Sequence, residues 1–287
     1  MHFGLRYCNT GRYVDGAKAV ELVQAAEEAG FESAWTVEHT VVPAGHASAY
    51  PYSPDGRMAG SVYDFPLPDP LIWMTYVAAR TTSIKLGTGI LILPQHSPVI
   101  TAKQVATLDV MSGGRVLLGI GVGWLKEEFE AIGASFSDRA RRTDEYVAVL
   151  RALWAEERPS FTGEFIRFDG AYCRPQPVNG TVPIHVGGHS PAAARRAGRL
   201  GDGFFPARGN PVELVAMARD AATAAGRDPE SLEITLSCPE NLSDLASLKK
   251  LGVRRVLVPV NSTPGMVAAA RNPEGVLAWR SRIEEFA

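Results

Sequence analysis

The sequence predicts an α/β fold of alternating strands and helices, and three observations lead to that prediction. The chain has 287 residues, 46% hydrophobic and 21% charged, which is ample for one large core. Short apolar stretches alternate with helical patterns from end to end. Residues 84–129 read as two buried strands flanking one helix with short joints, which makes the two strands parallel neighbours.

Residues 84–129 show the repeating unit most clearly. Strand 85–93 is rich in Ile and Leu, helix 99–111 is closed by Gly113, and strand 116–120 runs into the glycines of residues 121–123. Both strands are apolar on both faces, as strands covered by helices on each side are. Both end in glycine-rich turns at their C-terminal ends, where parallel α/β folds bind ligands.

Eight such strands are predicted, each followed by a helix. The strands are residues 3–7, 33–37, 85–93, 116–120, 184–186, 203–205, 232–237 and 255–260. The helices are residues 16–29, 69–80, 99–111, 144–156, 192–199, 212–225, 242–251 and 273–286. Eight βα units in a chain of this length predict a (β/α)8 barrel that forms a single domain over residues 1–287. A doubly wound open sheet is the alternative, but no GxGxxG motif follows the first strand.

Two insertions interrupt the alternation. One follows the second strand, where residues 40–68 are rich in Pro and Gly, and a loop this long is usually functional, often a lid. The other lies between the fourth and fifth strands, where residues 158–183 read as a turn with short β segments and a proline-rich connection.

Charge and cysteine content exclude several classes of protein. The net charge of −2 provides no basic field, so we expect neither nucleic acid nor a membrane as a partner. Cys8, Cys173 and Cys238 are scattered, which fits neither a disulfide framework nor a zinc site. No secretion signal, membrane-length apolar run, HExxH, P-loop, GxSxG or CxxC motif is present, so we expect a cytoplasmic protein without a metal. A homodimer is also expected.

Candidate functional residues are those just past the strand ends, because that end of a barrel holds the active site. His39 has the acidic neighbour Glu38 and is interpreted as an acid/base or as a donor to a cofactor; a loop histidine fixed by a carbonyl is the alternative. Trp124 lines a substrate pocket or, alternatively, packs in the core. His96 and His185 are interpreted as structural or solvent residues, and Glu127 and Glu128 as a solvated helix face.

The fifth-strand turn is the candidate anion site. Gly187, Gly188, His189 and Ser190 stand between a strand and a helix, with Ser190 as the N-cap. A helix N-terminus preceded by glycines is suited to phosphate, and an ordinary tight turn is the alternative.

Long stretches resemble the bacterial luciferase-like superfamily, in the branch of probable coenzyme F420-dependent oxidoreductases. The matching text includes GFESAWTVEHTVVP, YPYSPDGRM, residues 69–133, RRTDEYVAVLRALW, FTGEFIRFDGAYCRPQPV and PIHVGGHSPAAARRAGRLGDGF. The resemblance implies a flavin-type ring over the C-terminal ends of the strands. It also implies an F420-dependent hydride transfer to or from a small organic substrate.

The resemblance also implies roles for residues. A cis peptide at Gly89-Ile90 would back the ring, His39 would lie near its redox-active edge, and Glu38 stands where many relatives have Asp. The glycines Gly121 and Gly123 would contact the cofactor, and Gly187, Gly188, His189 and Ser190 would hold its phosphate. Trp124 stands where a sugar-phosphate dehydrogenase branch has a proton-donating glutamate, which argues against sugar-phosphate oxidation. An FMN-dependent luciferase-like monooxygenase is the main alternative, followed by a non-catalytic cofactor-binding barrel and a sugar-phosphate isomerase or lyase.

Overall fold

The computed structural model describes residues 1–53, 55–58, 64–261 and 270–286. Within these ranges, parallel strands form a closed eight-stranded barrel, because β3 pairs with β5 and completes the ring. In ring order the strands are β1 (His2–Arg6), β2 (Ser33–Thr36), β3 (Lys85–Thr88), β5 (Val116–Gly121), β8 (Ile184–Gly187), β9 (Gly203–Phe205), β10 (Glu233–Ser237) and β11 (Val253–Pro259). The predicted (β/α)8 barrel is confirmed.

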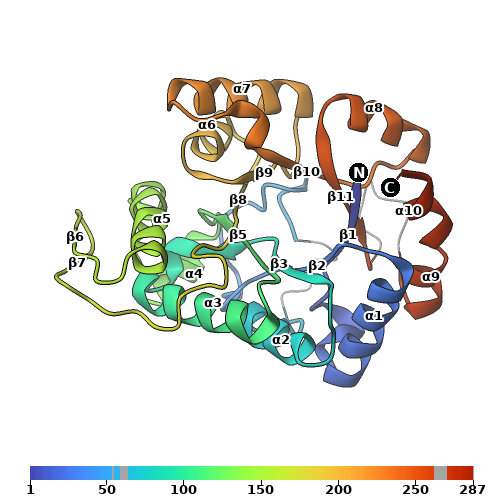
Figure 1. Ribbon diagram of the computed structural model, residues 1–287, viewed down its shortest axis with the longest axis horizontal. Coiled ribbons are helices and arrows are strands. Elements are labelled where there is room, and N and C mark those ends of the chain that lie inside the picture. The colour runs from blue at the N-terminus through green and yellow to red at the C-terminus, as the bar shows by residue number, and fades with distance from the viewer. Residues whose placement is uncertain (54, 59–63, 262–269, 287) are drawn as a thin grey trace.

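Helices surround this ring, as Figure 1 shows. They are α1 (Gly16–Ala29), α2 (Pro70–Ala78), α3 (Pro98–Ser112), α4 (Lys126–Ala131), α5 (Arg139–Ala155), α6 (Pro191–Leu200), α7 (Pro211–Ala224), α8 (Leu245–Lys250), α9 (Pro273–Leu277) and α10 (Arg280–Phe286). Short 3-10 helices are η1 (Gly11–Val14), η3 (Leu93–Gln95), η4 (Pro229–Ser231) and η5 (Leu242–Asp244). The chain ends lie side by side, where the Met1 amino group donates to the Phe286 carbonyl over 2.9 Å.

Local capping signals explain where several helices begin and end. The Asp69 side chain accepts the Ile72 N–H at 2.9 Å and starts α2, with Pro70 at the first helical position. Gly113 ends α3 at a φ of +74°, a left-handed conformation that suits glycine. The start of α2 after Asp69 and the end of α3 at Gly113 agree with the sequence prediction.

Four elements differ from the prediction. The single strand over 85–93 is divided into β3, β4 (Leu91–Ile92) and η3, because the chain breaks the strand geometry at Gly89 and Ile90. The helix over 144–156 begins earlier, at Arg139, and the helix over 273–286 is two helices, α9 and α10. The first turn of the helix over 242–251 is the 3-10 helix η5. In the second insertion, β6 (Phe161–Thr162) and β7 (Arg167–Phe168) form the expected short β segments as an antiparallel pair.

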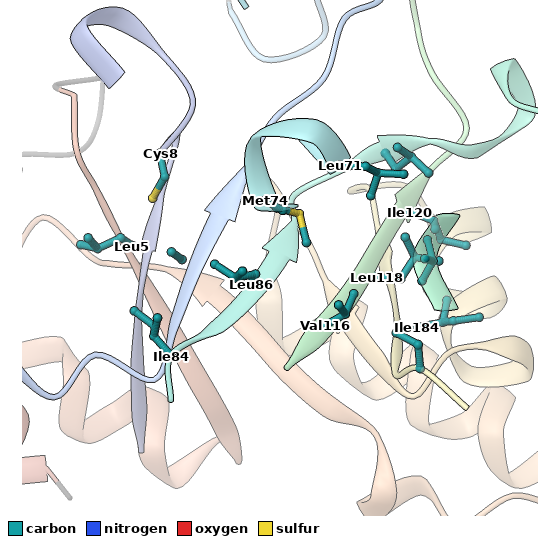
Figure 2. Close-up of a cluster of buried hydrophobic side chains, with 14 of the residues drawn as sticks. Leu5, Cys8, Leu71, Met74, Ile84, Leu86, Val116, Leu118, Ile120 and Ile184 are labelled. Atoms are coloured by element: carbon teal, nitrogen blue, oxygen red, sulfur yellow. The ribbon is translucent and has the colours of Figure 1, made fainter. Parts of the chain in front are cut away.

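Side chains alternate between the two faces of the barrel wall. Outward residues such as Leu5, Leu86, Leu118 and Ile184 join Met74 of α2 in the core between strands and helices (Figure 2). This layer is the expected consequence of burying a parallel sheet under amphipathic helices.

The inside of the barrel is filled by a few large side chains. Trp35, Leu117, Phe205 and Leu257 form an interior cluster, each no more than 4% exposed. Glycines leave room for them: a Cβ on Gly87 would lie 2.6 Å from the Trp35 ring. The interior is therefore a packed core rather than a channel.

A buried ion cluster closes the N-terminal end of the barrel, which we call the floor. Arg255 of β11 is 1% exposed, and its Nε and Nη2 donate to the Glu32 carboxylate at 2.7 and 2.8 Å. Its Nη2 also pairs with Glu233, and its Nη1 donates to Thr235 at 3.1 Å. The opposite end, where the strands end, we call the mouth. No helix within the described ranges is long and apolar enough to cross a membrane.

Candidate active site

Glu38 and His39 follow β2 at the mouth, and their side chains have different partners. The Glu38 carboxylate is 6% exposed, lies 2.8 Å from His96 Nε2 and accepts the Ile92 N–H. His39 Nδ1 lies 3.0 Å from Glu128 Oε2. The structure therefore does not bring these two predicted catalytic residues to a common partner. The contacts of Glu38 hold the segment after the strand break, and its catalytic role stays a prediction.

Glu128 was expected on a solvated helix face, and that expectation is wrong. Its side chain is 1% exposed, and Oε1 accepts the N–H groups of Thr40 at 2.6 Å and Val41 at 3.3 Å. A carboxylate can only accept, so His39 carries its proton on Nδ1 and leaves Nε2 to exchange a proton with a ligand. Sequence reasoning missed this pair because α4 has too few residues for an apolar periodicity to show.

The neighbouring Glu127 holds the same loop. Its Oε1 accepts the N–H groups of Ala47 at 2.7 Å and Ser48 at 3.1 Å. The Ser48 side chain, followed by the main-chain N–H groups, lowers the pKa of Glu127 to about 2 against the opposing effect of burial. Together the two glutamates of α4 fix the start of the long insertion over the mouth, so Glu127 is also more than a solvated residue.

Two further histidines lie in contrasting environments. Burial lowers the pKa of His96, but the hydrogen bond and charge of Glu38 outweigh it and raise the pKa above its ordinary value. His185 of β8 points into the barrel, 1% exposed, where burial and then Arg255 lower its pKa to about 3. Neither ring nitrogen of His185 has a partner in the described chain. His185 is therefore not a solvent residue, and His96 is half-buried against Glu38; a structural role for both stays a prediction.

The cis peptide between Gly89 and Ile90 is confirmed. The Ile90 side chain lies against Gly121 and Gly187, where an added Cβ would come within 2.6 and 2.5 Å of it. These two glycines therefore make room for Ile90. Gly123 has a φ of +78°, and a Cβ there would lie 2.7 Å from the Phe129 ring. Contact of these glycines with a cofactor stays a prediction.

The turn between β8 and α6 is the predicted phosphate site. Ser190 caps α6, accepting the Ala193 N–H at 3.2 Å, and Gly188 has a φ of +122°. The Gly188 N–H already donates to the Phe205 carbonyl at 3.2 Å, so it is not free for a ligand. His189 Nδ1 is buried without a partner in the described chain, and burial followed by Arg208 lowers the pKa of this histidine. An anion at this turn stays a prediction.

A row of aromatic side chains crosses the mouth. The Trp124 ring centroid lies 5.9 Å from that of His39 and 5.2 Å from that of Tyr50. Tyr50 lies 5.2 Å from Tyr52, which in turn lies 5.2 Å from His189. Trp124 is half-buried among mouth residues, as the substrate-pocket interpretation requires. The long insertion supplies the tyrosines, so it covers the residues predicted to bind cofactor and substrate.

Three comparisons place the chain among known proteins. It is 33% identical over 224 residues to an F420-dependent glucose-6-phosphate dehydrogenase of Mycolicibacterium gilvum, covering 75% of this chain but 61% of that protein. It is 30% identical to the monooxygenase RslO1 from Streptomyces bottropensis, with a TM-score of 0.64 over 88% of this chain and 75% of that one. The coenzyme F420-dependent tetrahydromethanopterin reductase from Methanopyrus kandleri shares the fold at 18% identity, with a TM-score of 0.76 over 99% of each chain.

The sequence profile of one family matches most of the barrel. It is described as luciferase-like monooxygenase, and it matches residues 4–240. The match runs from β1 into the segment after β10, so it includes His39, the cis peptide and the β8 turn. The chain belongs to the luciferase-like monooxygenase family.

Proposed function

We propose that this protein is an F420-dependent oxidoreductase that transfers a hydride between the deazaflavin and a small organic substrate. The observation that carries the proposal is the His39–Glu128 pair at the barrel mouth, 3.0 Å apart, beside the residues that follow the cis peptide. The 33% identity to an F420-dependent dehydrogenase supports the choice of cofactor. Glucose 6-phosphate is not proposed as the substrate. Trp124 stands where the resemblance implies a proton-donating glutamate in sugar-phosphate dehydrogenases, and an indole cannot replace a carboxylic acid as proton donor.

The residues at the mouth fit a flat ring with polar edges. Gly89 presents no side chain, and the Phe205 and Trp35 rings support it from inside the barrel, 3.5 and 3.4 Å from where its Cβ would be. Buried polar atoms without partners in the described chain, Gln95 Nε2 and His189 Nδ1, lie on the segments after β4 and β8. Such atoms are costly unless a ligand or water completes them.

The chain supplies proton transfer and positioning. When bound, the deazaflavin supplies a ring that carries hydride rather than single electrons. His39 holds or releases a proton at Nε2, while Glu128 fixes the orientation of its ring through Nδ1. Trp124, Tyr50 and Tyr52 form the aromatic row over the mouth, where they would contact a bound cofactor or substrate.

An FMN-dependent monooxygenase is the second candidate. The 30% identity to the monooxygenase RslO1 favours it, since the two chains share most of their length. That chemistry requires reduced flavin and access for oxygen, whereas the F420 reaction requires only hydride and proton transfer.

Cofactor titration separates the two candidates. F420 fluorescence quenching is expected to give a lower Kd than FMN, and reduced F420 should be oxidised by a member of a panel of enones, imines and nitro compounds. The His39→Ala variant is the matched control, since it should bind F420 but not turn over. Micromolar FMN binding with oxygen uptake and no F420 binding would establish the monooxygenase instead.

A further inference from the structure

Arg6 is a buried cation at the mouth of the barrel. It is the last residue of β1 and is 9% exposed. Its Nη1 donates to Ser237 Oγ of β10 at 2.5 Å, and its guanidinium lies 5.4 Å from the centroid of the Phe205 ring of β9. These contacts reach strands across the ring, so the side chain points into the barrel interior.

The charge of Arg6 has no acidic partner in the described chain. Its hydrogen bonds go to two neutral hydroxyls, Ser237 and Tyr7, the latter at 2.7 Å from Nη2. The residues outside the described ranges include no Asp or Glu. Buried charges are ordinarily paired, because desolvation of a lone ion is costly. An anionic ligand would supply the missing partner.

Other buried arginines show what a satisfied environment looks like. Arg115 is 8% exposed, and its Nε, Nη1 and Nη2 all donate, to Thr81 Oγ1 and to main-chain carbonyls. Arg196, 7% exposed, pairs with Asp144. Arg6 has neither a ring of carbonyls nor a carboxylate, which distinguishes a ligand-binding cation from a structural one.

Tyr7 is held in a strained conformation directly over Arg6. Its φ of +64° makes it the only non-glycine residue with positive φ in the described chain. The turn brings the ring within 4.3 Å of the Arg6 guanidinium. Strain of this kind is retained where the surroundings enforce it, commonly at ligand-binding positions.

Two tyrosines of the aromatic row, Tyr50 and Tyr52, interact electrostatically with Arg6 and keep their phenol protons. Burial raises the pKa of Tyr50 to about 12, with Tyr7 adding to the rise and Arg6 opposing it. Burial likewise raises the pKa of Tyr52, again with opposite effects of Tyr7 and Arg6. Both phenols therefore stay protonated and can donate. A guanidinium with hydroxyl donors is the donor set that recognises a carboxylate.

We propose that Arg6 binds a carboxylate of the substrate, so that the substrates of this enzyme are small organic acids. The assignment to the substrate rests on the proposed oxidoreductase function. Asn9 fixes Arg6 relative to the catalytic histidine: it donates to the Val37 carbonyl at 2.8 Å and accepts the Val37 N–H at 2.9 Å, tying the ends of β1 and β2 together. Phe205 lies between Arg6 and Gly89, which places the carboxylate site beside the cis peptide.

Calorimetric titration of the full chain with benzoate and benzamide tests the proposal, with acetate and acetamide as a smaller pair. At least one acid should bind about tenfold or more tightly than its amide, since hydrogen bonds to charged groups have roughly this effect. Arg6→Met should abolish the difference. Arg12→Met, which removes an exposed arginine of η1 and changes the charge equally, should retain it.

Thermal unfolding separates binding from a structural role. Arg6→Met should leave the Tm unchanged or raise it, because it removes an unpaired buried charge. A parent protein that binds acids and amides equally, or an Arg6→Met variant that still prefers acids, would overturn the proposal. A lower Tm for Arg6→Met with the preference intact would show that Arg6 is only structural.

An F420 titration shows whether the anion bound by Arg6 belongs to the substrate or to the cofactor. Arg6→Met should bind F420 as the parent does. If the variant loses F420 affinity more than about tenfold and benzoate competes with F420, the anion belongs to the cofactor and the substrate assignment is overturned. If the parent prefers acids but binds no F420, the proposed oxidoreductase function fails while the carboxylate site stands.

Discussion

Each end of this barrel has a buried arginine, and the two arginines differ in whether carboxylates pair with them. At the floor, Arg255 pairs with the carboxylates of Glu32 and Glu233 and donates to Thr235. At the mouth, Arg6 is 9% exposed, and the partners of its guanidinium among the described residues are hydroxyls and aromatic rings. The floor is satisfied within the chain, and the mouth is left to be completed from outside. Stability and function are thus separated along the barrel axis, as in other barrels.

Histidines show the same separation. His185 lies in the interior against the Trp35 ring, and its nitrogens have no hydrogen-bond partner in the described chain, whereas His39 at the mouth is hydrogen-bonded to Glu128 through Nδ1. A histidine in the barrel interior is therefore expected to affect stability when it is replaced, and a histidine at the mouth is expected to affect catalysis.

The largest expected effect is on catalysis at the mouth. His39→Ala should lower turnover roughly 10²- to 10⁴-fold, the range for loss of a general acid or base, with little change in F420 affinity or Tm. Steady-state kinetics with F420 and an accepted substrate measures this. A variant with near-parent turnover would return His39 to a loop histidine.

Glu128→Gln sharpens that prediction. The amide of Gln would donate to His39 Nδ1 and move the ring proton to Nε2, while its carbonyl still accepts from Thr40. Turnover should fall, and ¹⁵N NMR of the imidazole should report the exchanged tautomer. An unchanged tautomer would show that the carboxylate does not fix His39.

At the floor, the expected effect is on stability alone. Arg255→Met removes the buried cation of this cluster and leaves Glu32 with Lys85 alone and Glu233 without a basic partner, which should cost about 3 kcal/mol in the free energy of unfolding, the lower end of the range for breaking a buried ion pair. Denaturant unfolding measures it, and Arg6→Met is the matched control at the mouth. Equal losses for both arginines would break the comparison between floor and mouth.

His185 should make the protein less stable in acid. Its folded-state pKa of about 3 lies below the unfolded value of 6.5, so the unfolded chain binds more protons between these pH values. Stability is then lost as pH falls below 6.5, by about 1.4 kcal/mol per pH unit. His185→Leu should remove this slope.

The measurement is the difference between parent and His185→Leu unfolding curves. The difference is needed because His96 has the opposite sign: its raised pKa contributes stability that is present at low pH and lost as pH rises through the folded value. Parallel curves for the two proteins would show that His185 is not held neutral.

Features set by local sequence could be predicted, and those set by distant contacts could not. The eight strands, the Asp69 and Ser190 caps and the Gly113 stop follow from nearby residues. Glu128 could not be recognised, because its partners Thr40 and Val41 are 88 and 87 positions away. The sequence does contain a signal for Arg6. It is a charged residue at the end of a mostly apolar strand, and because it follows the outward Leu5 its side chain is expected on the inward face.

Glycines show the limit of a local pattern. Gly121 and Gly187 were interpreted as cofactor residues; the structure shows that they also accommodate Ile90, and their contact with a cofactor stays a prediction. A glycine pattern reports that something approaches closely, and only the fold reveals whether it is a ligand or another side chain.

The smallest expected effect is at the β8 turn. Replacing Gly188 is a poor test of this turn, since its φ of +122° would strain any side chain. His189→Leu is cleaner, because it leaves the backbone unstrained. It removes Nδ1, which is buried and without a partner in the described chain, together with Nε2 and the ring contact with Tyr52. If that nitrogen completes its hydrogen bonding with the cofactor, the variant should bind F420 about two- to tenfold more weakly, the value of a neutral hydrogen bond. Fluorescence titration measures the change, and the Tm should stay constant because no internal hydrogen bond of that nitrogen is lost. Unchanged F420 and FMN affinities would place the phosphate elsewhere, and the mouth would then be completed by a ligand at Arg6 and His39 without this turn.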